Sequence, residues 1–323
     1  MSSADGMSTC DVVLLGAAHI HMRNLARVVR SRPGVRVVAV WDHDPGRAER
    51  WASVLDTAAC TDVDAALEAI ALRGALVYSE TSRHRALVSA AGRRGLAVFV
   101  EKPLAVRQTD AVAMSEALAG GGLFSTGFFL RYASAFQRLR DMVASGDLGE
   151  VRHAAVSMVH GGLGQGWFDG EYAWMRERAE GGGGFFDLVV HCLDLAAWVL
   201  GPIEHVIDVR TYATGHHGFA VVHMESGTVV DLEAGWEASA PAIQMSVTGA
   251  TTTLTASGAQ LVAGSTVIAT GRPPDAGDAP HAWLDALVHD PDQPLVSVDD
   301  AIDRVLAIDL LRHRASSDPS QAT

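Results

Sequence analysis

Short apolar runs alternate with amphipathic, helix-like stretches over the first 127 residues. The runs of strand length fall at residues 11–15, 35–41, 75–78 and 96–100. Breaker residues mark the borders between strand and helix patterns, as at Pro33-Gly34 and Pro45. Strand–helix units of this length predict a parallel sheet with helices on both faces. We therefore expect an α/β domain over about residues 8–127.

The pattern changes after about residue 128. A glycine-dense stretch at 160–184 is too long and irregular for an ordinary connection, so it is a candidate active-site loop. Long β segments over 203–270 predict an open, mostly antiparallel sheet. Further elements are expected as a strand at 151–159 and helices at 133–144, 187–200 and 298–314. We expect a second α/β domain over 128–297, with helix 298–314 a candidate to pack back on the first domain.

Length and charge narrow the classes of partner. At 323 residues the chain exceeds the size at which a single core usually stops growing, which agrees with two domains. The net charge of −13 argues against a nucleic acid or an anionic membrane as partner. An apolar sheet face free of helices would need a cover, which predicts a homodimer or homotetramer.

The sequence suits a reducing compartment. Its three cysteines, Cys10, Cys60 and Cys192, are odd in number and widely spaced, unlike a disulfide framework or a zinc knuckle. The N-terminus shows no signal-peptide pattern, and no run reaches the roughly 18 apolar residues of a membrane span. We expect a cytoplasmic protein.

Among 25 lysine and arginine residues, Lys102 is the only lysine. Arginine replaces lysine where any surface cation suffices, but not where a compact, titratable charge is required. Lys102 lies in Glu101-Lys102-Pro103, directly after the apolar run 96–100. A single lysine that survived by chance at a strand end is the alternative. We interpret Lys102 as a residue with a chemical role.

The turn after the first strand has the position of a dinucleotide turn. It reads Gly16-Ala17-Ala18-His19-Ile20-His21, so only the first glycine of the G-x-G-x-x-G pattern is present. By itself it could be an ordinary strand–helix turn. Asp42 ends the second strand, where a carboxylate can accept hydrogen bonds from ribose hydroxyls and repel a 2′-phosphate, which favours NAD over NADP. Arg47 is close enough in sequence to leave NADP open.

A second cluster follows the glycine run at 181–184. Asp187 and His191 are four residues apart at the start of a predicted helix, so they share a face. The glycines allow a close approach of backbone or ligand. The alternatives are a helix-capping role for Asp187 and a core role for His191.

Together these elements resemble the Gfo/Idh/MocA family of glucose–fructose oxidoreductase and inositol dehydrogenase. The resemblance covers nearly the whole chain. Its motifs are Ser79 to Pro103 with His84, Gly127-Phe128-Phe129-Leu130-Arg131-Tyr132, Gly182 to Gly201 with Asp-x-x-x-His, and Pro294 to Ala301. The degenerate glycine turn is the main departure. The resemblance implies a Rossmann-type domain followed by an α/β domain with an open sheet.

The resemblance also implies an NAD-dependent dehydrogenase or reductase. It would transfer a hydride between nicotinamide and a hydroxyl or keto carbon of a sugar, cyclitol or related small molecule. His191 would move the hydroxyl proton, Asp187 would orient His191, and Lys102 would donate to the reacting oxygen. The implied or expected cofactor contacts are Gly16, Ala18, His19, Asp42, Ser79, His84, Glu101 and Lys102. The implied or expected substrate contacts are Arg131, Trp167 and Trp174.

Two other functions are compatible with the same domains and site residues. One is elimination or glycoside hydrolysis in which bound NAD is reduced and reoxidised in each turnover. The other is a non-catalytic regulator that senses dinucleotide. A metal is not expected, because His216, His217 and His223 lie in a β region without supporting ligands.

Overall fold

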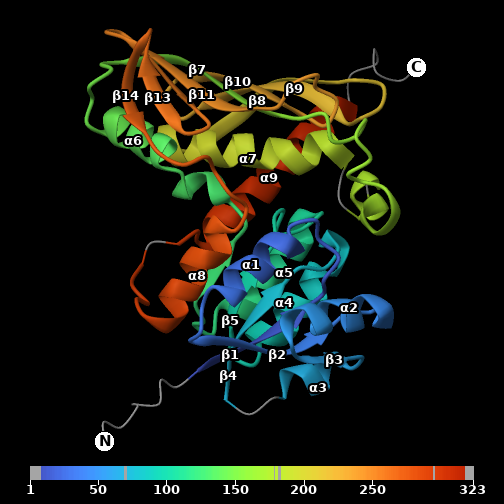
Figure 1. Cartoon of the computed structure of the whole chain (residues 1–323). Helices are drawn as coiled ribbons and strands as arrows, with labels where there is room; N and C mark the ends of the chain where they lie inside the picture. Colours follow the sequence, from blue (N-terminus) through green and yellow to red (C-terminus); the bar gives the residue numbers. More distant parts are fainter. Residues whose placement is uncertain (1–8, 69–70, 178, 181–182, 294, 317–323) are drawn as a thin grey trace, which may run out of the picture. The chain divides into compact units, whose positions relative to one another are not determined.

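The computed structural model describes residues 9–316 apart from 69–70, 178, 181–182 and 294 (Figure 1). Gly181, Gly182 and Pro294, which the motifs above include, lie outside the described residues. The chain forms two compact units. Unit 1 comprises residues 1–105, 109–127 and 276–299, and unit 2 comprises 106–108, 128–275 and 300–323.

Unit 1 is built on a six-stranded sheet in the order β3-β2-β1-β4-β5-β6, in which every pair is parallel. The strands are β1 (Cys10–Leu15), β2 (Val35–Trp41), β3 (Ala58–Cys60), β4 (Leu72–Val77), β5 (Ala97–Val100) and β6 (Phe124–Thr126). The strand order reverses direction between β1 and β4, and such switch points receive ligands in open α/β sheets. The near-continuous apolar strands β1 and β5 are buried throughout, as the sequence predicts, whereas the edge strand β3 is largely exposed.

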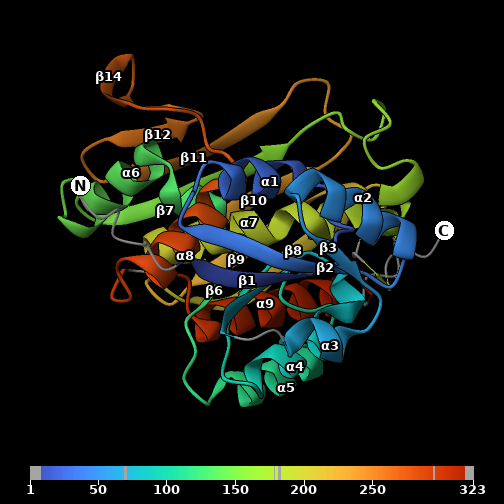
Figure 2. The same cartoon turned by 60° about the horizontal axis from the view of Figure 1, so that its bottom comes forward.

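Helices cover both faces of this sheet. They are α1 (Met22–Arg30), α2 (Pro45–Leu55), α3 (Val63–Leu67), α4 (His84–Gly92), α5 (Gln108–Leu118) and α8 (Asp278–Val288). Figure 2 shows α1 and α2 on one side of β1 and β2, and α3, α4 and α5 on the other. The predicted Rossmann-type parallel sheet is confirmed.

Helix α8 joins unit 1 from a distant part of the sequence. Trp283 is fully buried, and a Cβ added at Gly74 on β4 would lie 2.8 Å from its ring. Trp283 also contacts Phe99 of β5, with ring centroids 6.1 Å apart. The structure therefore differs from the predicted boundaries, which place 276–297 in the second domain and contain no helix there.

Unit 2 is built on an eight-stranded sheet in the order β14-β13-β12-β11-β7-β10-β9-β8. Its strands are β7 (Val151–Val159), β8 (Ile203–Thr211), β9 (His217–Met224), β10 (Val229–Gly235), β11 (Ala242–Gly249), β12 (Thr253–Ser257), β13 (Gln260–Ala263) and β14 (Thr266–Thr270). Only β7 and β10 pair in parallel. The predicted open, mostly antiparallel sheet is confirmed.

The helices of unit 2 include α6 (Ser134–Ala144), α7 (Gly183–Leu200) and α9 (Val298–Ser316). Figure 1 shows α6 and α7 on one face of the sheet, and no helix of the described residues on the other. Beyond residue 299, α9 belongs to unit 2. This differs from the expectation that the C-terminal helix is a candidate to pack on the first domain. Arg304 on α9 donates a hydrogen bond to the carbonyl of Leu193 on α7, which ties the two helices together.

Helix α7 corrects two expectations. It begins at Gly183, four residues before the predicted start at Asp187. Its 18 residues have a mean hydropathy of 1.5, so a segment long and apolar enough to cross a membrane does exist. This segment is 83% buried inside the structure, which is typical of a core helix.

Candidate functional site

The turn after β1 is fixed against the end of β4. Gly16 has a φ of +81°, and an added Cβ would lie 2.4 Å from the Cβ of Ser79, so only glycine fits. The amides of Ala18 and His19 donate to the carbonyl of Tyr78 at 3.0 and 2.9 Å. The turn thus keeps the first-glycine geometry of a dinucleotide turn, while two of its amides are bound within unit 1.

Asp42 is buried at the end of β2, and its carboxylate is already surrounded by donors. The amide of Ala17 donates to it at 2.7 Å, and the amide of Asp44 at 2.8 Å. Arg47 adds two bonds, from Nε at 2.8 Å and from Nη2 at 2.7 Å. A carboxylate accepts about four hydrogen bonds. We expected Asp42 to accept hydrogen bonds directly from ribose hydroxyls, and this would require one of the present donors to move.

Arg47 is held between two acids. Besides Asp42, it donates to Glu80 Oε1 at 2.9 Å. Burial of the guanidinium opposes its charge, but the two carboxylates outweigh this and raise the pKa of Arg47. A guanidinium whose charge is balanced in this way is a poor receptor for a 2′-phosphate. The geometry therefore favours NAD over NADP at the position where the sequence left NADP open.

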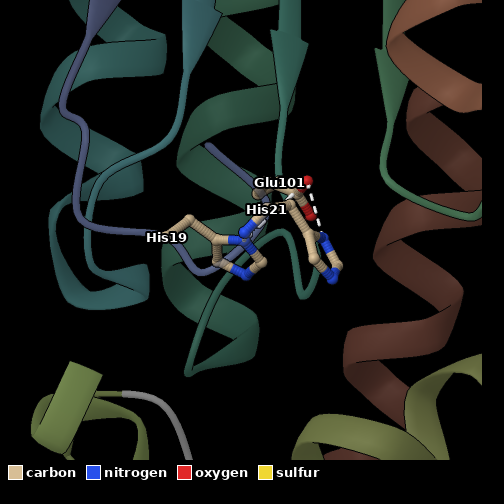
Figure 3. Close-up of side chains that lie close together, drawn as sticks. All are labelled: His19, His21 and Glu101. Carbon is tan, nitrogen blue, oxygen red and sulfur yellow. Dashed lines mark hydrogen bonds and ion pairs between the residues drawn. The ribbon is translucent and has the colours of Figure 1, made fainter. Parts of the chain in front are cut away.

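Glu101 is at the centre of a buried polar cluster in unit 1, shown in Figure 3. Its Oε1 lies 3.1 Å from Nδ1 of His21 and 3.9 Å from Nδ1 of His19. The other oxygen, Oε2, accepts from the amide of Lys102 at 3.1 Å. An added Cβ on Gly127 would lie 2.5 Å from Oε2, so a larger residue there would displace this carboxylate. Lys102 is only 2% exposed.

The charges of this cluster are coupled. Burial raises the pKa of Glu101, but His19, His21 and Lys102 outweigh it, so the net pKa is lowered and the carboxylate is ionised. Burial lowers the pKa of His19 well below its usual value, against the attraction of Glu101. At neutral pH the cluster therefore contains an ionised carboxylate beside a neutral imidazole.

His84 and Ser79 have supporting roles in unit 1. His84 is fully buried, and its Nδ1 lies 3.2 and 3.1 Å from the carbonyls of Pro103 and Leu104. Its Nε2 lies 3.3 Å from the carbonyl of Ser79. Both ring nitrogens thus face backbone acceptors. The ring ties the chain after β5 to the end of β4, and the implied contact of His84 with cofactor stays a prediction.

In unit 2, Asp187 and His191 lie one turn apart on α7, and both are buried. The ring of His191 contacts Phe128 and Phe129 edge-on, with centroids 6.1 and 5.0 Å away. Because α7 begins at Gly183, Asp187 is neither a cap nor a first-turn acid. The capping alternative for Asp187 is therefore excluded, and the pair remains the candidate proton-transfer group.

Arg131 is an ion-pair partner rather than an open substrate contact. Its Nε and Nη2 donate to the two oxygens of Asp194 at 2.9 and 2.5 Å. Its Nη1 donates to Asp300 at 2.9 Å. Burial opposes the charge, but the two carboxylates raise the pKa of Arg131. All three guanidinium nitrogens are used inside unit 2, so the implied contact of Arg131 with substrate, which stays a prediction, would require one of these bonds to be exchanged.

The glycine-dense loop is organised by aromatic rings. Phe168 is buried and stacks on Trp236 with centroids 3.6 Å apart. Trp167 is 46% exposed and lies 5.0 Å from the ring of His160. Trp174 lies in the 3₁₀ helix Gly170–Arg176 and is half-buried. The expected substrate contacts Trp167 and Trp174 are thus both partly accessible, and neither belongs to the buried stack.

Sequence reasoning missed the residues that hold the start of α7. The amide of Gly184 donates to Nδ1 of His216 at 3.1 Å. His216 stacks on Trp236, and an added Cβ on Gly184 would lie 2.6 Å from that ring. His217 stacks instead on Tyr212, so the neighbouring histidines do not share a site. The run of glycines before α7 is the signal that could have pointed to this close packing.

A parallel sheet with its switch point between β1 and β4, followed by an open mixed sheet, defines a two-domain α/β protein of the dinucleotide-binding class. Residues 10–128 match the oxidoreductase family with an NAD-binding Rossmann fold, and residues 136–255 match the GFO/IDH/MocA C-terminal domain. The chain belongs to the Gfo/Idh/MocA oxidoreductase family. The predicted family, fold and NAD-binding class are confirmed.

Curated relatives include two cyclitol dehydrogenases. An inositol 2-dehydrogenase of Streptomyces avermitilis is 38% identical over 69% of this chain and 64% of its own length. A scyllo-inositol 2-dehydrogenase (NAD(+)) of Bacillus subtilis is 29% identical over 70% and 66%. The matched region thus spans slightly less than two thirds of the length of each of these relatives.

Solved structures share the fold over nearly the whole chain. The crystal structure of GenD2 from gentamicin A biosynthesis in complex with NAD has a TM-score of 0.81 and 22% identity, covering 98% of this chain and 97% of that one. The WlbA dehydrogenase from Bordetella pertussis, in complex with NADH and UDP-GlcNAcA, has a TM-score of 0.83 and 14% identity, covering 98% and 97%. At these identities the likeness shows the fold.

Proposed function

We propose that the protein is an NAD-dependent dehydrogenase or reductase that acts on a hydroxyl or keto carbon of a cyclitol or sugar. The observation that supports this most directly is the position of Lys102. The only lysine of the chain is buried beside an ionised Glu101, directly after β5 of the NAD-binding unit. Its curated relatives include enzymes named as inositol dehydrogenases.

Bound NAD would supply the acceptor for the hydride. Lys102 donates a hydrogen bond to the substrate oxygen and stabilises the negative charge that develops there as hydride leaves carbon. His191 takes the hydroxyl proton, or returns it in the reductive direction. Asp187, one turn earlier on α7, orients the imidazole. The oxidation is balanced, because carbon loses a hydride and oxygen loses a proton.

Turnover and cofactor retention test this function together. Native mass spectrometry of the purified protein should detect NAD(H), and a panel of cyclitols and keto-sugars should give a net change in nicotinamide absorbance. Lys102→Met and His191→Asn should abolish this change, while the exposed Arg152→Ala, a matched control, should not. Retained NAD(H) with product formation but no net absorbance change would instead indicate transient redox use in elimination or hydrolysis. NAD binding without any reaction would indicate a regulator.

The open sheet face of unit 2 supports a homodimer or homotetramer. Large apolar side chains on this sheet are exposed, including Tyr212 at 52% and Phe219 at 41%. We expect Phe219→Asp to shift the mass in solution toward the monomer, measured by light scattering during size exclusion. A wild-type protein that is monomeric at micromolar concentration would contradict this assembly. The free cysteines Cys10, Cys60 and Cys192 support a reducing, cytoplasmic setting.

A further inference from the structure

Two histidines and a glutamate of unit 1 present ligand atoms to one point. His19 and His21 lie on the turn between β1 and α1, and Glu101 follows β5, so the three come from opposite sides of the strand-order reversal (Figure 3). One ring nitrogen of each histidine and one carboxylate oxygen all lie within 4.8 Å of one another. Two imidazoles and one carboxylate form a donor set of catalytic zinc sites.

The distances agree with a single ion. Zinc lies about 2.0–2.2 Å from nitrogen and carboxylate ligands, so two ligands of a tetrahedral ion lie about 3.4 Å apart. Glu101 Oε1 lies 3.1 Å from His21 Nδ1 and 3.9 Å from His19 Nδ1. Movements of about half an ångström would bring both pairs to the separation that an ion requires. The rings of His19 and His21 are inclined by 68°, with centroids 4.6 Å apart, so they do not block one another by stacking.

The ligand atoms are also held in suitable states. The amide of His21 donates to His19 Nδ1 at 3.3 Å, so this nitrogen carries a lone pair and can bind an ion in place of that long bond. The amide of His19 is fixed to Tyr78, which holds the turn in position. His19 and Glu101 are almost fully buried, whereas the side chain of His21 is 21% exposed and leaves access from solvent.

We propose that His19, His21 and Glu101 bind one divalent transition-metal ion, with Zn²⁺ as the ion that best suits two imidazoles and a carboxylate. This replaces our sequence-based expectation of no metal. Three protein ligands leave a fourth position for water or for an oxygen of a bound ligand. The site lies at the turn that lacks two of the three dinucleotide glycines, so the ion would provide positive charge where that turn's amides are directed into the protein.

A second group, Glu204, His205 and His223, provides an internal comparison. Its ligand atoms also lie within 4.8 Å of one another, but Glu204 and His205 are exposed. Exposed groups of this kind bind ions weakly, because flexible side chains must be ordered and water competes. We therefore expect no high-affinity ion there, and His223→Ala serves as a matched control.

The test uses the full chain, freed of any affinity tag and stripped with a chelator. Zn²⁺ affinity and stoichiometry are measured by competition with a chromophoric chelator, and Co²⁺ reports the geometry through its visible absorption. Wild type and His223→Ala should bind one ion per chain with a tetrahedral Co²⁺ spectrum. His21→Ala and Glu101→Gln should weaken binding at least about 100-fold, beyond the 10–100-fold cost of losing an outer contact. Melting curves check that each variant is folded.

Two further signatures separate a built site from chance binding. Affinity should fall with decreasing pH, because protons compete with the ion for imidazole nitrogens and carboxylate oxygens. Lys102→Met should tighten zinc binding, because the positive charge of Lys102 beside Glu101 repels the zinc ion. Wild type that binds fewer than one ion at micromolar Zn²⁺, or equal affinity in folded His21→Ala, would overturn the proposal. Neither result bears on hydride transfer, because no cofactor or substrate is present.

Discussion

Unit 1 places three buried carboxylates at the carboxyl ends of strands, whereas unit 2 places its buried carboxylates along one helix. In unit 1, Asp42, Glu80 and Glu101 follow β2, β4 and β5, which are far apart in sequence but lie within the four-strand stretch β2-β1-β4-β5 of one parallel sheet. In unit 2, Asp187, His191 and Asp194 are spaced by four and three residues on α7, so they form a polar stripe on an apolar helix.

The buried carboxylates of the two units receive hydrogen bonds from different kinds of donor. At the strand ends, backbone amides such as those of Ala17 and Lys102 satisfy the carboxylates. On α7 the helix amides are already used within the helix, so a carboxylate needs a side-chain partner, and Arg131 provides it for Asp194. The strand-end groups are therefore positioned by the fold of the sheet. The helix stripe depends more on individual ion pairs.

The largest effect is expected when the ion pair between Arg131 and Asp194 on α7 is broken. Arg131→Leu leaves Asp194 buried without its cation, which typically costs about 3–5 kcal/mol of unfolding free energy. Urea denaturation of wild type and variant measures this loss. Arg152→Leu, an exposed arginine on β7, should stay within about 0.5 kcal/mol of wild type. An unchanged midpoint for Arg131→Leu would restore the substrate role for this residue.

Substitution of Lys102 tests whether the strand-end cluster takes part in catalysis. Lys102→Arg keeps the charge but replaces a compact ammonium with a wide fork, so turnover should fall about 10²–10³-fold, or about 2.7–4 kcal/mol in the barrier. Because Lys102 is buried, the larger side chain should also lower the melting temperature. Lys102→Met, which is closer in volume, separates the two effects. Near-normal turnover of Lys102→Arg would mean that position 102 needs only a cation.

Substitution of Asp42 tests whether the strand-end acids select NAD over NADP. Asp42→Ala removes one of the two acids that hold Arg47, and the freed guanidinium should attract a 2′-phosphate. A hydrogen bond to a charged group contributes about 1.5–3 kcal/mol, so the ratio of NADP to NAD affinity should rise about tenfold to a hundredfold. Calorimetric titration of both cofactors measures the ratio, with exposed Glu49→Ala as control. An unchanged ratio would exclude Asp42 and Arg47 from cofactor selection.

The smallest expected effect concerns His84 and pH. Burial lowers the pKa of His84, although carbonyl contacts and Glu101 oppose this, so the unfolded chain binds more protons below about pH 6.5. Stability of unit 1 is therefore fully present above that pH and falls as the pH decreases toward the lowered pKa. In His84→Gln the slope of unfolding free energy against pH should be shallower by up to about 1.4 kcal/mol per pH unit. The exposed His153→Gln should keep the wild-type slope.

The sequence predicted the helix stripe more directly than the strand-end cluster. The spacing of Asp187 and His191 places them on one face of any helix, so no tertiary information was required. The contact of His21 with Glu101 crosses 80 residues and depends on which strands are neighbours, which periodicity does not specify. Arg131 was expected to contact substrate, and Arg47 left NADP open, because a pattern does not reveal an acid that folds against an arginine. Helix α8 was missed because its partner surface lies on strands about 200 residues earlier.

The contact of Trp283 with Gly74 has a consequence for the order in which the protein is made. Unit 1 begins with the first strand, but its sheet lacks the cover over Gly74 until residue 283 has left the ribosome. Almost the whole of unit 2 is synthesised in that interval. Domains that are continuous in sequence fold one after another during translation. Here the N-terminal unit is started first but is completed only after residues 128–275 of unit 2 have been made. A fragment that stops at residue 127 would therefore expose the apolar surface on which α8 packs.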